Sequence, residues 1–290
     1  MAGLRIATDS TADVPPGLAS DLQIAVVPCQ VFWGEEVYRD GVDLQPQEFY
    51  QMLARSADLP KTSQPPMNRF VETYRRLLNV EGAEAVISIH VAGNLSGTVN
   101  GAWAAAQTLS DPSQIEVIDS GQISLGLGWA VIEAAQMAQS GFSREDVSRA
   151  VHGMLPRLRA AAMIDTLENL YKGGRISQVT AALGTVLRVK PLIRIERGRV
   201  EVIERVRTRS RALKRLVVMV RSWGPLARVA VLHTGAEELA QELVSMIEDL
   251  APDNEIMIEP AGAALTTHLG IGAVGVCAVA APGEEWLVFG

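Results

Sequence analysis

One strand-to-helix unit in the first half of the chain constrains the fold more than any other segment. Residues 86–91 form an apolar, β-branched run that is typical of a buried strand. A loop of small and hydroxyl residues follows at 92–98, and residues 102–106 have helix-forming composition. In an open α/β sheet, ligands bind beyond the carboxyl ends of the strands, where such a loop meets a helix. We therefore expect Ser96 and Thr98 to lie at a site for a small anionic group, either a carboxylate or a phosphate.

The rest of the first half alternates between strand and helix signals. Strands are predicted at residues 4–7, 24–33, 36–39 and 115–118, the second and third as a small β excursion around Gly34. Helices are predicted after Pro15-Pro16, after the possible caps Asp43 and Ser63, over residues 122–140, and after Ser143, whose spacing to Asp146 resembles a capping box. Alternation of this kind predicts a parallel sheet with right-handed crossovers.

The second half has a different pattern, which predicts an α+β domain. A short strand ending at Asp165 precedes a helix that stops at Gly173-Gly174. Arg197-Gly198 joins two strands of a predicted hairpin, and a basic helix then runs to Arg221. The remaining elements are strands at 229–232, 255–258 and 274–280 and a helix at 237–250. We place the two domains at residues 1–160 and 161–290, in direct contact, so that a crevice lies between them.

The composition is that of a globular protein with an aliphatic core. The 290 residues are 48% hydrophobic but only 5% aromatic. The net charge of −7 argues against a nucleic-acid surface. Residues 194–215 are rich in arginine, and we interpret them as a solvated hairpin and helix face. The alternative is an interaction module in which this segment docks a protein or a nucleic acid.

The sequence has neither the cysteine spacing of a metal-binding protein nor the apolar start of an exported one. Cys29 and Cys277 are far apart, without the spacing of a zinc site, and are expected to be small core residues. Asp9 interrupts the apolar start too early for a secretory signal. Apolar runs stay shorter than the roughly 20 residues of a transmembrane helix. We therefore expect a cytoplasmic protein.

The common nucleotide and nucleophile motifs are not supported. Residues 270–275 match GxGxxG by letters, but that fingerprint needs a βαβ unit and an acidic residue about 20 residues later, and the sequence ends at Gly290. Ser96 does not lie in a GxSxG elbow, and the ring of His90 is expected to point into a helix layer. An acyl- or phosphoryl-transfer enzyme using Ser96 or His268 remains the alternative to a binding protein.

Several loops rich in hydroxyl groups and glycine remain, and together they suit a carboxylate or phosphate. Their series resembles the motifs of the DegV family in order and over nearly the whole chain: residues 8–13, 61–65, 95–98, 117–120, 165–170, 172–177, 190–192 and 267–270. The resemblance implies an α/β fold, with an N-terminal parallel-sheet, Rossmann-like domain and a C-terminal α+β domain. Val99 and Ile271 depart from the family pattern and affect the expected tunnel shape more than the head-group site.

The same resemblance implies a function without catalysis. DegV proteins bind a long-chain fatty acid in a tunnel, and some present its carboxylate to a separate fatty acid kinase. By motif, Thr62 and Ser96 would bind the carboxylate, while Ser63, Arg175 and His268 would line the head-group mouth or face the partner. The expected ligand is a long-chain fatty acid such as palmitate. No cofactor, metal or nucleic acid is expected, and transient membrane contact stays open.

Simple energetics agree with such a ligand. Burying a CH₂ group contributes about 0.8 kcal/mol, so a sixteen-carbon chain gains on the order of 12 kcal/mol before the costs of association. A carboxylate moved out of water needs hydrogen-bond donors. We therefore expect the tunnel to supply affinity and the hydroxyl groups to orient the head group.

Overall fold

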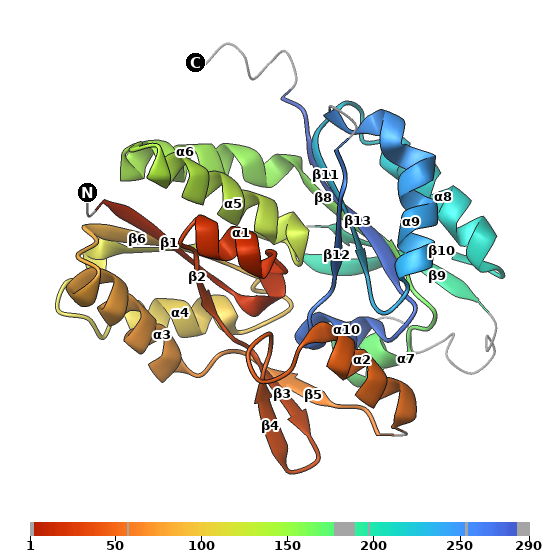
Figure 1. Ribbon diagram of the computed structural model, residues 1–290, viewed down its shortest axis with the longest axis horizontal. Helices are drawn as coiled ribbons and strands as arrows, with labels where there is room; N and C mark the ends of the chain where they lie inside the picture. The colour runs from red at the N-terminus through yellow and green to blue at the C-terminus, as the bar shows by residue number, and fades with distance from the viewer. Residues whose placement is uncertain (1–2, 57, 177–188, 197, 253–254, 283–290) are drawn as a thin grey trace.

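The computed structural model describes residues 3–56, 58–176, 189–196, 198–252 and 255–282; Ser177 and Arg197, which the sequence analysis named, lie outside these ranges. Within them the chain forms two larger sheets and one small sheet, arranged side by side with helices between and around them (Figure 1). This arrangement confirms the expected combination of a parallel α/β part and an α+β part.

The first sheet is parallel and four-stranded, in the order β2-β1-β6-β7. Its strands are β1 (Leu4–Asp9), β2 (Ala25–Val27), β6 (Ala85–His90) and β7 (Ile115–Asp119). One face carries α3 (Met67–Arg75), which continues as a π-helical turn over Arg76–Val80, and α4 (Thr98–Ala106). The other face carries α1 (Pro16–Asp21), α5 (Leu125–Gln139) and α6 (Arg144–Met154). Short 3₁₀ turns occupy Ser10–Ala12, Pro112–Gln114 and Leu155–Arg157.

The second sheet is mixed and six-stranded, in the order β10-β9-β8-β13-β11-β12. Its strands are β8 (Leu158–Met163), β9 (Lys190–Glu196), β10 (Arg199–Val206), β11 (Leu226–His233), β12 (Met257–Pro260) and β13 (Val274–Ala280). All neighbours are antiparallel except β11 and β12. On its outer face lie α8 (Arg209–Arg221) and α9 (Glu237–Ile247), the latter followed by a 3₁₀ turn at Glu248–Leu250 (Figure 1).

A smaller unit closes one end of the space between the two sheets. It contains β3 (Gln30–Trp33), β4 (Glu36–Arg39) and β5 (Lys61–Ser63), in the order β4-β3-β5, with α2 (Pro46–Arg55). Next to it are α7 (Glu168–Lys172) and α10 (Ala263–Leu269), at the lower centre of Figure 1. Elements from both halves of the chain therefore meet at this end.

Helix α5 joins the two sheets because its first half is apolar on every side. Its residues 125–132 are all buried, in keeping with a helix that has packing partners all round. It contacts β1 of the first sheet and β13 of the second. The indole Nε1 of Trp129 donates to the carbonyl oxygen of Cys277 at 3.3 Å. The two sheets thus share one core rather than being joined by a flexible linker.

Two predicted helix caps are wrong, and one is confirmed. Asp43 does not cap α2, because the helix begins at Pro46 and Asp43 instead forms an ion pair with Arg39 at 2.7 Å. Ser63 does not cap α3, since it pairs with Gln30 as the last residue of β5. Ser143 does cap α6, with its hydroxyl accepting from the amide of Asp146 at 3.1 Å.

Candidate functional site

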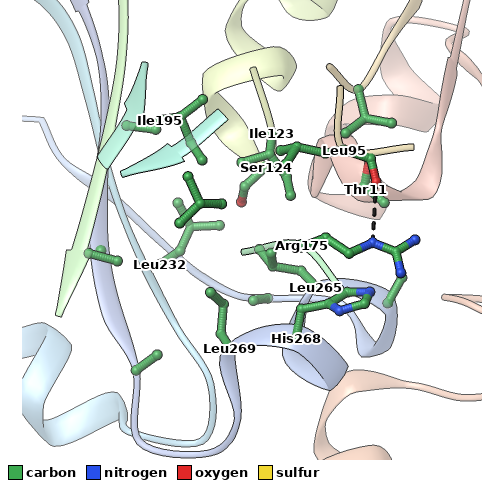
Figure 2. A pocket seen from close by; sticks show the side chains of 18 of the residues that line it. Thr11, Leu95, Ile123, Ser124, Arg175, Ile195, Leu232, Leu265, His268 and Leu269 are labelled. Carbon is green, nitrogen blue, oxygen red and sulfur yellow. Dashed lines mark hydrogen bonds between the residues drawn. The ribbon is translucent and has the colours of Figure 1, made fainter. Parts of the chain in front are cut away.

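A largely aliphatic cavity lies between the two sheets. It encloses about 1070 Å³ of space between atoms, the solvent at its opening included. Figure 2 shows that residues of both halves face this space, among them Ile123, Leu232 and Leu265. The aliphatic part of the wall is Val91, Leu95, Ile123, Leu170, Ile193, Ile195, Val200, Leu232, Leu265 and Leu269, together with Ala160, Ala161, Ala162, Ala261, Ala264 and Ala273. Such a wall suits a hydrocarbon chain.

A group of polar side chains lines the cavity where it adjoins a second hollow. Other polar residues of the wall are Thr11, Ser124, Arg194, His233 and Thr234. All five residues predicted for the site line the cavity, namely Thr62, Ser63, Ser96, Arg175 and His268, and Gln64 lies among them. A second, more open hollow shares all of these residues except His268 and adds Gln30, Pro65, Pro66 and Gly97. The polar end of the cavity therefore continues into a polar hollow at the surface.

Thr62 and His268 are in direct contact although 206 residues separate them. Thr62 lies on β5 and His268 near the end of α10, and Thr62 Oγ1 is 2.8 Å from His268 Nε2. Burial, with a smaller effect of the nearby Arg175 charge, lowers the pKa of His268 to about 4. The imidazole is therefore neutral at neutral pH.

The surroundings of His268 indicate which ring nitrogen carries the proton. Its Nδ1 is buried and has no hydrogen-bond partner among the described residues. A buried N–H without an acceptor is rarer than a buried acceptor without a donor. We therefore place the proton on Nε2, where it is donated to Thr62 Oγ1. The Thr62 hydroxyl is then free to donate its own proton into the cavity.

Ser96 lies immediately before α4, at the predicted strand-to-helix corner. Its Oγ is 2.8 Å from Thr98 Oγ1 and accepts from the Thr98 amide at 3.3 Å. In the described part of the chain, no imidazole or carboxylate forms a hydrogen bond with the Ser96 hydroxyl. It therefore lacks the adjacent base that activates a serine nucleophile.

Arg175 follows α7 and spans the polar end of the cavity. Its Nε donates to the Leu95 carbonyl at 3.2 Å, the bond drawn in Figure 2, and one Nη donates to the Gly173 carbonyl at 2.5 Å. The guanidinium thus connects the loop before α4 to the turn after α7. Gly173 packs against the His268 ring, because an added Cβ there would overlap Nδ1.

His90 belongs to a separate, fully buried network. Its Nδ1 is 2.9 Å from Asp9 Oδ2, and its Nε2 is 2.7 Å from Ser88 Oγ, which also accepts from the Tyr74 hydroxyl. The ring meets Phe70 of α3 edge-on, at 5.2 Å between centroids. His90 therefore points into the helix layer, as expected, and does not pair with Ser96.

The arginine-rich segment lies on β9, β10 and α8, away from the polar end of the cavity. Several of its cations are neutralised: Arg194 pairs with Glu201, Arg209 with Asp165 and Arg215 with Glu204. Of the arginines of this segment that the structure describes, Arg194 alone lines the cavity. The segment forms the predicted hairpin and helix face.

Other features predicted from the sequence can be placed as well. Cys29 and Cys277 are buried and both line the cavity. Across the described ranges, His, Cys, Asp and Glu side chains form no group of three that could hold a metal ion. The described helices include none with the length and apolarity needed to cross a membrane. Gly270 and Gly272 form the turn between α10 and β13, which pairs antiparallel with β11, so no dinucleotide-binding unit is present there.

Three residues of interest escaped the sequence analysis as functional candidates. Gln64 lines both hollows, and the buried carboxyl groups of Asp13 and Asp40 hold the start of α10. Gln64 was noted only as part of a loop. Asp13 was noted only as the last residue of the motif at 8–13, and Asp40 was not singled out, because their role depends on a helix that lies more than 200 residues away.

Comparisons with known proteins point to one family. The family model described as "Uncharacterised protein, DegV family" matches residues 3–281. Protein DegV of Bacillus subtilis (strain 168) is 34% identical over 278 residues, which cover 94% of this chain and 98% of that protein. A DegV domain-containing protein of Deinococcus radiodurans is 36% identical over 281 residues, covering 94% and 97%.

Solved structures show the same fold. A fatty-acid-binding DegV family protein from Thermus thermophilus superposes with a TM-score of 0.87 at 33% identity, covering 96% of this chain and 99% of its own. DegV from Bacillus subtilis, described as a fatty acid binding protein, has a TM-score of 0.85 at 33% identity, with the same coverage of 96% and 99%.

Proposed function

The chain belongs to the DegV family, and on that premise we propose that it binds a long-chain fatty acid in the cavity between its sheets. The observation that carries this proposal is a mainly aliphatic cavity that adjoins a polar surface hollow at Thr62, Ser96 and Arg175. The similar proteins of Thermus thermophilus and Bacillus subtilis, both described as fatty acid binding, support it. The hydrocarbon chain would occupy the aliphatic part, and the carboxylate the polar end.

In this proposal Thr62 and Ser96 hold the carboxylate. The Nε2 proton of His268 leaves the Thr62 hydroxyl free to donate to an anion. Ser96 and the first amides of α4 add further donors at the same end. Arg175 and Ser63 would lie at the mouth, where the outer hollow opens to solvent. The site then binds and orients a carboxylate without chemistry of its own.

Mass spectrometry tests the ligand, and hydroxyl variants test its orientation. The purified protein should carry about one fatty acid per chain and should take up hexadecanoate after delipidation. Thr62→Val and Ser96→Ala should each weaken hexadecanoate binding roughly tenfold, since hydrogen bonds to charged groups contribute about 1.5–3 kcal/mol. Isothermal titration calorimetry would measure both affinities.

Two comparisons make the result decisive. Hexadecanol, which has the same chain but no charge, should bind the two variants nearly as well as the wild type. Ser245→Ala removes an exposed hydroxyl of α9 and should leave hexadecanoate binding unchanged. A wild-type protein that neither carries nor takes up fatty acid would refute the proposal.

We further propose that the protein presents the bound carboxylate to a separate fatty acid kinase. The outer hollow supports this, because it would give a partner access to the head group while the chain stays buried. Ser96 lacks a base among the described residues, which favours presentation over acyl or phosphoryl transfer by this chain alone. A kinase reaction that is unaffected by adding the loaded protein would count against it.

Cytoplasmic location and transient membrane contact stay predictions.

A further inference from the structure

Gln64 lines both the cavity and the outer hollow, although it was not among the predicted site residues. It follows β5 directly, is half-buried, and lines both the cavity and the outer hollow beside Thr62 and Ser96. Its backbone carbonyl accepts from the Ser63 hydroxyl at 3.2 Å. Its side-chain carboxamide, by contrast, makes no hydrogen bond to any described residue. Two amide donors therefore remain available at the mouth of the cavity.

Two glycines of the α4 region make room for this carboxamide. A Cβ added to Gly97 would overlap Gln64 Oε1 and lie 3.1 Å from its Cδ. A Cβ added to Gly101, one helical turn later, would lie 3.0 Å from Gln64 Nε2. The side chain thus lies along the first turn of α4, directly against the backbone. Its position is fixed by close packing, although its polar atoms have no partner.

We infer that Gln64 is a further binding residue for the head group, donating an amide N–H to the bound carboxylate from the solvent side. This inference rests on the proposed function, because it needs the carboxylate at Thr62 and Ser96. The two hydroxyl groups would reach the ligand from β5 and from the loop before α4, and Gln64 lines both hollows together with them. An N–H donor bonds a carboxylate more strongly than the neutral oxygen of an alcohol or ester, so it favours the acid.

Two substitutions of similar volume test the inference. Gln64→Met removes the donor and should weaken hexadecanoate binding about fivefold to tenfold. Gln64→Glu adds a negative charge beside the amino end of α4, where a carboxylate stays ionised, and should weaken binding by more than tenfold. Neither variant should change the affinity for hexadecanol by more than about twofold. Calorimetric titration of delipidated protein with both compounds gives the comparison.

A glycine variant displaces the same carboxamide without altering it. Gly97→Ala should weaken hexadecanoate binding as much as Gln64→Met does, and should have little further effect when it is combined with Gln64→Ala. Gly153→Ala is the matched control, since a Cβ at that position meets no atom within 4 Å.

The possible outcomes separate this inference from the function on which it rests. An acid-selective loss in the Gln64 variants supports it. Unchanged affinity, or an equal loss for acid and alcohol, overturns it, since the latter shows a purely structural role. If Thr62→Val still weakens hexadecanoate binding, the proposed function stands without Gln64. If the wild type binds no fatty acid, both fail.

Discussion

His268 links the pH dependence of stability to the head-group site. Its pKa is lowered to about 4 by burial and by Arg175, against about 6.5 in the unfolded chain. Between these two values the unfolded chain takes up a proton that the folded protein does not. The contribution of His268 to the free energy of unfolding is therefore complete above pH 6.5 and is lost as the pH falls towards 4.

Replacing His268 by asparagine should remove this dependence. The amide can still bond Thr62 but does not titrate, so the free energy of unfolding should fall less steeply between about pH 7 and pH 4. The difference from wild type over that range should approach about 3 kcal/mol. Urea unfolding of delipidated protein at a series of pH values measures it. Parallel curves for the two proteins would contradict the assignment of the low pKa to His268.

At the scale of elements, two buried carboxyl groups hold the start of α10. Asp13 Oδ1 accepts from the Gly262 amide and Asp40 Oδ1 from the Ala263 amide, each at 2.9 Å. Burial raises the pKa of Asp13 to about 7 and that of Asp40 to about 6. Because α10 carries His268 at its other end, these contacts position the residue that orients Thr62.

Asp13 changes the free energy of unfolding with pH in the opposite direction to His268. The folded protein holds a proton on Asp13 that the unfolded chain releases above its pKa of about 3.8, so the free energy of unfolding rises as the pH falls from about 7 towards 4. Asp13→Asn should abolish this component and be more stable than wild type near pH 8, by on the order of 1–3 kcal/mol. Exposed Asp21→Asn is the control for thermal unfolding at both pH values. A variant less stable than wild type near pH 8 would show that the carboxylate itself is required.

Local sequence signals predicted most elements but few of their contacts. The order of strands and helices follows from hydrophobic periodicity, and Ser143 acts as the predicted cap. The predicted caps Asp43 and Ser63 are wrong because α2 begins at Pro46 and α3 begins directly after Pro66. A hydroxyl residue near a helix start does not reveal whether its own segment pairs as a strand, as Ser63 does with Gln30.

In the site, too, local sequence signals predicted some residues but not their contacts. Ser96 follows from the strand-to-helix corner alone. Thr62 and His268 were assigned by family resemblance, since no periodicity connects two residues 206 apart. The position of Gln64 depends on the missing side chains of Gly97 and Gly101 on another element. Such packing exists only once the chain has folded, so the sequence contains no local signal for it.

At the scale of the whole molecule, the cavity wall is shared between the two halves of the chain. Tyr50 of α2 ties them together, because its hydroxyl donates to the Ala261 carbonyl at 2.5 Å and lies 3.1 Å from that of His233. Helix α5 packs on both sheets. A ligand in this cavity would touch both halves at once, so its binding energy should stabilise the molecule as a unit.

Thermal unfolding with and without lipid tests this coupling. A ligand at a hundred times its Kd stabilises the folded state by about 2.7 kcal/mol, and each kcal/mol raises the Tm of a chain of this size by about 2–4 °C. Hexadecanoate should therefore raise the Tm of delipidated protein by roughly 5–10 °C, in one cooperative transition. The Thr62→Val, Ser96→Ala double variant should need far more lipid for the same shift. If only part of the unfolding transition moved with lipid, the chain would be bound by one half alone, and the cavity between the sheets would not be its site.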